Sequence, residues 1–146
     1  MSELLRNTAL TVPLLSWAVA QFLKAVYHLV TQRKLDMRLL ISAGGMPSSH
    51  SAFVSSLATA IGLREGLGSS AFAICVVFAS VVMYDAAGVR RAASRQASIL
   101  NRILDELFSG QPLSEERLWE LIGHTPIQVV VGATLGVVLT WLLIGR

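Results

Sequence analysis

Four long stretches without a charged residue constrain the fold of this chain more than any other feature. They cover residues 7–23, 39–63, 66–84 and 121–145. A helix that crosses a bilayer needs about 20 mostly apolar residues, with a range of about 17 to 25. Only 14% of the 146 residues are charged, against about 25% in soluble domains. A soluble bundle of buried helices would therefore have too little polar surface, and we predict an all-α, polytopic helical membrane protein.

The pattern predicts about four transmembrane helices plus a cytoplasmic-side amphipathic helix, in a single membrane-embedded domain over residues 1–146. The expected spans are residues 8–30, 48–63, 71–84 and 127–144. After the third span, apolar residues recur at helical spacing over residues 89–107, and arginines occupy much of the remaining surface. This pattern is typical of an amphipathic helix that leaves the membrane or lies on it.

Basic residues are concentrated in two of the connecting segments. Arg33, Lys34 and Arg38 follow the first span, and further arginines are spread over residues 90–117. Lysine and arginine near span ends favour the cytoplasmic side, so both termini are expected outside and both basic connectors inside. This orientation brings polar residues from all four spans to one membrane surface. We therefore expect a multi-pass protein of the cell (inner or plasma) membrane whose functional face is cytoplasmic.

The second span begins with an unusually polar segment, GGMPSSHS, at residues 44–51. The first amides of a helix lack intrahelical partners, and the helix dipole adds partial positive charge there. Glycines just before such a start allow a ligand to approach the backbone closely, and phosphate is a common ligand of such sites. Ser48 and Ser49 fit phosphate contacts, although helix capping alone explains them equally well. His50 in the first turn adds an ionisable group that capping does not require.

The last span begins in a similar way, with GHTPIQVVVGATLG at residues 123–136. Here His124 precedes the helix, and Gly132 and Gly136 are spaced to let a neighbouring helix approach closely. Two histidines that meet at a phosphate pocket suit a two-step transfer. One imidazole attacks phosphorus and the other protonates the leaving alkoxide.

Further polar residues are expected at the same surface. A phosphoryl group in transfer spreads negative charge over three oxygens and needs cations nearby; the candidates are Lys24, Arg90 and Arg91. Headgroup binding or topological anchoring is the alternative for the two arginines. Asp85 ends a hydrophobic span, where a carboxylate is costly unless it is paired, so we expect it to orient a histidine or hold an arginine. Gln21 is interpreted as a member of the same polar network.

Taken together, these motifs resemble a known superfamily. PSSHSAFVSSLA resembles the Pro-Ser-Gly-His signature of the type 2 phosphatidic acid phosphatase and vanadium haloperoxidase superfamily. HTPIQVVVGATLG resembles the signature that contains its second histidine. With AQFLK, GGMPSSHSA, YDAAGVRRAASRQASILN and GHTP in order, residues 17–136 look most like the small divergent branch of that superfamily found in bacteria and plastids.

The resemblance implies roles for the candidate residues. His124 would be the nucleophile that forms a phosphohistidine, and His50 the acid that protonates the leaving group. Ser48 and Ser49 would contact the phosphate.

The chain departs from the superfamily pattern at three points. The first signature, Lys-x6-Arg-Pro, is absent, and Lys24 is only a loose counterpart of its lysine. Leu118 stands where an arginine is expected six residues before the nucleophile, and Gln128 stands where an aspartate partner of the nucleophile is expected. Gln128 is kept as a candidate substrate contact, and Asp85 becomes a candidate replacement for the missing carboxylate.

We therefore predict a membrane phosphatase that hydrolyses a lipid phosphomonoester or pyrophosphate through a phosphohistidine intermediate. Phosphatidylglycerophosphate, phosphatidate and prenyl pyrophosphates all fit as substrates. The expected partners are the phosphorylated lipid and membrane lipids; a homodimer is compatible with the sequence, and no nucleic acid, metal or cofactor is expected. Two other classes stay open. One is a non-catalytic membrane protein that binds anionic headgroups or a partner, and the other is a small transporter or channel subunit.

Overall fold

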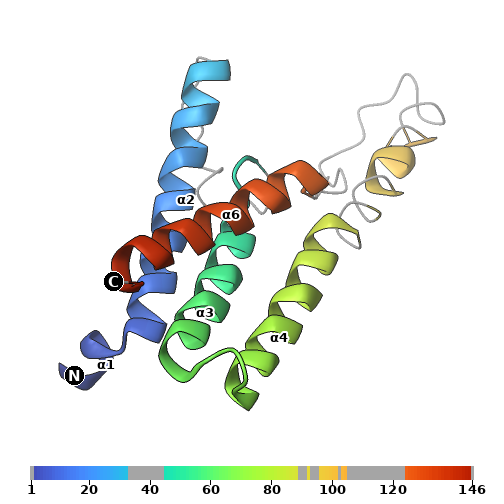
Figure 1. Cartoon of the computed structure of the whole chain (residues 1–146). Helices are drawn as coiled ribbons and strands as arrows, with labels where there is room; N and C mark the ends of the chain where they lie inside the picture. The colour runs from blue at the N-terminus through green and yellow to red at the C-terminus, as the bar shows by residue number, and fades with distance from the viewer. Residues whose placement is uncertain are drawn as a thin grey trace.

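The computed structural model describes residues 2–32, 45–88, 92, 96–101, 103–104 and 124–145, and these residues form an all-α protein (Figure 1). Its helices are α1 (Ser2–Arg6), α2 (Thr8–Gln32), α3 (Ser49–Glu65), α4 (Ser70–Ala87) and α6 (Pro126–Ile144). The four long helices begin and end within a few residues of the predicted spans. Of the predicted amphipathic helix, residues 92, 96–101 and 103–104 are helical, and the rest lies outside the described residues.

Three of the described helices are long and apolar enough to cross a membrane. They cover Thr8–Thr31, Ser70–Ala87 and Pro126–Ile144. The expected second span, α3, differs from them because it has only 17 residues and is rich in serine and alanine. It packs against α2, α4 and α6, and Figure 1 shows it in the middle of the bundle. The predicted second span is thus present as α3, but its surface suits contact with neighbouring helices better than contact with lipid.

The distribution of side-chain sizes fits a membrane environment. Small residues fill the interior, whereas the outer side of α4 carries Ile74, Val77, Phe78 and Val81, each more than half exposed. In water such an apolar face would be unfavourable, but in a bilayer it contacts lipid tails. Small residues inside allow close helix contacts, which is how membrane helices associate.

α3 and α6 approach each other closely. A side-chain carbon added at Gly132 would overlap the Ser48 carbonyl oxygen, and one added at Gly136 would overlap the Ala52 carbonyl oxygen. The two backbones therefore touch at successive turns. This confirms the helix-packing role predicted for the two glycines.

Buried hydroxyl groups join three helices in the interior. Ser56 Oγ of α3 lies 2.6 Å from Thr140 Oγ1 of α6, and Ser16 Oγ of α2 donates to Ser56 Oγ at 3.1 Å. One residue closer to the start of α3, Ser55 Oγ donates to the Ala133 carbonyl at 3.0 Å. Polar groups within a bilayer need such partners because no water is available to them. These bonds hold α2, α3 and α6 in one register.

Candidate functional site

The starts of α3 and α6 and the end of α4 are joined by backbone hydrogen bonds. Ser48 N donates to the Gln128 carbonyl at 3.1 Å, which connects the start of α3 to the first turn of α6. His124 N donates to the Ala86 carbonyl at 3.2 Å, which connects the start of α6 to the last turn of α4. The structure thus brings together the polar ends of the second, third and fourth predicted spans, which alternating topology places on one surface.

The start of α3 is built around Ser48. This residue is the N-cap; its Oγ accepts from Ser51 N at 3.3 Å and from Ser51 Oγ at 2.9 Å. Ser48 and Ser49 are 0% and 1% exposed. Among the described residues, Ser49 Oγ has no hydrogen-bond partner. A buried hydroxyl in that state is costly, so Ser49 Oγ at a helix N-terminus is a ready donor for an anion.

The two predicted histidines are neighbours. Their ring centroids lie 6.3 Å apart and the ring planes are tilted by 58°. His124 is 1% exposed, whereas His50 is exposed. One imidazole is therefore held in the interior and the other stands at the surface next to it. Such a pair can act on opposite sides of one small group.

Gln128 holds His124 through an arrangement that the sequence expectation did not include. Its Oε1 accepts from Thr125 N at 3.0 Å and lies 3.4 Å from His124 Nδ1. Thr125 Oγ1 in turn accepts from Gln128 N at 3.4 Å, so the two residues form a capping box at the start of α6. The motif Thr-x-x-Gln is visible in HTPIQ, and it is the sequence signal that could have identified this role.

The capping box also indicates which tautomer of His124 the contact with Gln128 favours. A backbone N–H can only donate, so the Gln128 side-chain atom that faces Thr125 N must be the oxygen. The same oxygen faces His124 Nδ1, and this long contact is favourable only if Nδ1 carries the proton. The lone pair of the neutral ring is then on Nε2. Gln128 thus supplies the acceptor that an aspartate would have supplied, but without its charge.

Lys24 of α2 reaches the segment that precedes α3. Its side chain is 2% exposed and lies against Gly45, where an added Cβ would be 3.0 Å from Lys24 Cγ. Gly45 has a φ of 97°, in the left-handed region that favours glycine. Lys24 therefore brings the polar end of the first predicted span close to the start of α3. Gln21 is half-buried, one turn earlier on the same helix.

The structure describes the surroundings of the remaining predicted site residues only in part. Asp85 is half-buried in the last turn of α4, next to Ala86, whose carbonyl accepts from His124 N. Its role as a partner of His124 stays a prediction. Arg90 and Arg91 lie outside the described residues, so their predicted phosphate contacts also stay predictions.

Taken together, the fold and the site describe a helical membrane protein with a buried histidine, an exposed histidine and a helix N-terminus at one end of the bundle. The chain belongs to the divergent PAP2 family, which matches residues 5–139. It is 40% identical over 152 residues to the uncharacterized membrane protein YuiD of Bacillus subtilis (strain 168). That match covers 97% of this chain and 96% of YuiD. No solved structure matches the chain significantly.

Proposed function

We propose that this protein is a membrane phosphatase that hydrolyses a lipid phosphomonoester or pyrophosphate through a phosphohistidine at His124. The proposal rests chiefly on the His50–His124 pair, whose rings lie 6.3 Å apart beside the N-terminus of α3. The family membership supports a phosphatase, since PAP2-type proteins are named for that activity. Phosphatidate, phosphatidylglycerophosphate and prenyl pyrophosphates are the substrates to be compared.

In the first proposed step, the lone pair on His124 Nε2 attacks phosphorus. The bond between phosphorus and the ester oxygen breaks, and protonated His50 gives its proton to the leaving oxygen. In the second step, water attacks the phosphohistidine while neutral His50 takes the proton of that water. Inorganic phosphate leaves, and both histidines return to their starting states.

The surroundings supply the charge that this chemistry requires. The N-terminus of α3 and the Ser49 hydroxyl would bind phosphoryl oxygens, and Lys24 would balance their negative charge. The basic connectors at residues 33–38 and 90–117 favour a cytoplasmic position for this end of the bundle. We therefore propose that the site faces the cytoplasm, where a lipid phosphate made on that side could reach it.

The direct test is phosphate release by the purified protein in detergent or vesicles. A panel of the three lipid substrates and p-nitrophenyl phosphate should include at least one that releases phosphate. Vanadate should inhibit this release because it mimics five-coordinate phosphorus. If no member of the panel is hydrolysed while vanadate still binds, the protein is a headgroup-binding protein and the phosphatase proposal is wrong.

The role of Gln128 gives a prediction about pH. In Gln128→Glu the capping box is retained, because glutamate serves as well as glutamine at this position. The new carboxylate stabilises the protonated imidazolium of His124, but only the neutral ring attacks phosphorus. The acid limb of the kcat/KM profile should therefore move to higher pH by about one unit or more.

The matched control for this prediction is Thr125→Val. That change removes the other half of the capping box and leaves the Gln128 side chain beside His124. It should lower thermal stability slightly without moving the pH profile. An unchanged acid limb in Gln128→Glu would mean that Gln128 has no influence on the reacting nitrogen.

A further inference from the structure

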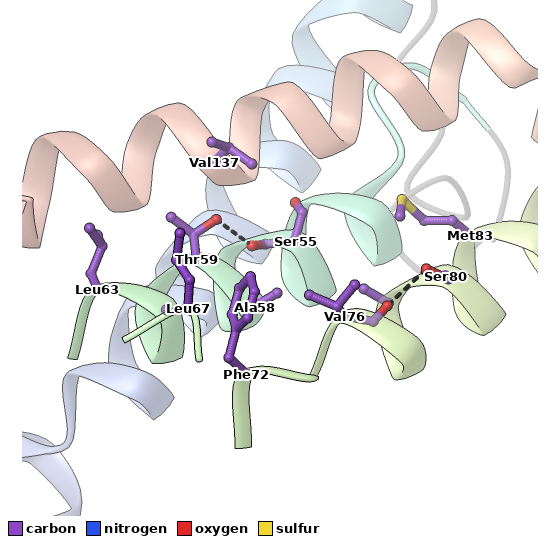
Figure 2. Close-up of a pocket in the computed structure, with 12 residues that line it drawn as sticks. Ser55, Ala58, Thr59, Leu63, Leu67, Phe72, Val76, Ser80, Met83 and Val137 are labelled. Atoms are coloured by element: carbon purple, nitrogen blue, oxygen red, sulfur yellow. Dashed lines mark hydrogen bonds between the residues drawn. The ribbon is translucent and has the colours of Figure 1, made fainter. Parts of the chain in front are cut away.

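An apolar groove lies between α3 and α4, with one wall completed by Val137 of α6 (Figure 2). It extends from Leu67 and Phe72, at the end remote from the histidines, to Ser55 and Met83. Its volume of about 450 Å³ falls within the range of about 300–1,000 Å³ that is usual for ligand pockets. The groove is therefore large enough for a ligand.

The hydroxyl groups in the groove wall are already used by the protein. Ser55 Oγ shares its proton between the Ser51 carbonyl at 2.7 Å and the Ala133 carbonyl at 3.0 Å, and Thr59 Oγ1 donates to the Ser55 carbonyl at 2.8 Å. On the opposite wall, Ser80 Oγ donates to the Val76 carbonyl at 2.8 Å, as Figure 2 shows. The groove thus presents mainly hydrocarbon to an occupant. A polar headgroup would lose its hydration there without gaining partners, whereas a hydrocarbon chain would not.

The groove leads toward the histidines. α4 and α6 are joined where His124 N meets the Ala86 carbonyl, and from there the two helices diverge (Figure 1). Met83 lies on α4 less than one turn before Ala86. On α3, Ser55 follows Ser49 by six residues, or about 9 Å at the helical rise of about 1.5 Å per residue. A phosphate bound at the start of α3 would therefore have its attached chain at the near end of the groove.

We propose that this groove binds a hydrocarbon chain of the substrate, so that the substrate is a lipid whose chain lies between α3 and α4 while its phosphate reaches His50 and His124. This inference rests on the proposed function and adds to it the part of the protein that selects a lipid over a soluble phosphate. The lipid would enter sideways from the bilayer, because Val76 and Ser80 on the groove wall are exposed.

Two adjacent residues of α4 provide a matched test. Val76 lines the groove, whereas Val77 lies on the outer face with Ile74, Phe78 and Val81. Val76→Phe should lower kcat/KM for long-chain phosphatidate by about tenfold or more, since several methylenes lose their buried position. It should leave kcat/KM for p-nitrophenyl phosphate, which has no chain, unchanged. Val77→Phe should change neither value.

Equal losses with both substrates in Val76→Phe would indicate damage to the site and would overturn the proposal, as would no loss with either. A second experiment does not depend on turnover. Phosphatidate with a photoreactive group in its chain should label the groove side of α4, and excess phosphatidate should displace the label while phosphatidylcholine should not.

The labelling experiment separates failure of this inference from failure of the proposed function. Specific labelling without phosphate release would support the groove and refute the phosphatase. Labelling that both lipids displace equally would mean that the groove holds only bulk lipid, and would refute the inference even in an active enzyme.

Discussion

Replacing His124 by alanine should abolish phosphate release, lowering kcat by about four orders of magnitude or more, as expected for loss of a nucleophile. The side chain is 1% exposed and lies beside the N-terminus of α3, so no solvent group can easily take its place. Radiolabelled substrate should give an acid-labile phosphoenzyme with the wild type and none with His124→Ala. The control is His28→Ala, which changes the third histidine of the chain, on α2.

Comparison with His50→Ala distinguishes the two histidine roles. Loss of a general acid usually costs about 10²–10⁴-fold, and this loss should appear in full with a lipid alkoxide leaving group. With p-nitrophenyl phosphate it should be much smaller, because that leaving group needs no proton. The phosphoenzyme should then accumulate, since His50 also activates the water. Trapping in His124→Ala but not in His50→Ala would reverse the assignment.

The second large effect is expected from Gly132→Ala. The added methyl group would overlap the Ser48 carbonyl oxygen, so α3 and α6 would have to separate. Separation would break the bond from Ser48 N to the Gln128 carbonyl and move the two histidines apart. Overpacking of this kind costs about 1–3 kcal/mol of stability, and activity should fall more steeply because the site lies at the contact.

The control is Gly68→Ala in the turn between α3 and α4, where an added Cβ has no atom within 4 Å. Thermal unfolding in detergent and phosphate release should both be measured for the two variants. A Gly132→Ala protein as stable and as active as Gly68→Ala would show that the α3–α6 contact does not position the site.

Much of the fold could be predicted because charge-free stretches and helix starts are local signals. Ser48 before α3, Ser69 before α4 and Pro126 at the start of α6 stand where such residues favour a helix to begin. The burial of α3 among the other helices was harder to predict from the sequence. A 25-residue stretch without charge meets the length criterion for a span, yet the serines within it become favourable only when α2 and α6 provide their partners.

The site was predicted in outline for a similar reason. The meeting of His50 and His124 followed from topology, because alternating spans bring the starts of α3 and α6 to one surface. The support of His124 was not predicted, since a missing aspartate directed attention to Asp85. At the position of the missing aspartate, Gln128 supplies an acceptor for His124 and also caps α6, while the role of Asp85 stays a prediction. That double use depends on side-chain geometry, which sequence spacing alone does not determine.

The serine-rich character of α3 has a consequence for how the protein is made. Segments that enter the bilayer one at a time must each be apolar enough to leave the translocon without a partner helix. Of the long helices described, α3 is the least apolar. Its partner Thr140 lies on α6, which follows α3 and α4 in the chain. Membrane integration of α3 should therefore be completed only after α6 emerges, so that the same step assembles the two halves of the site.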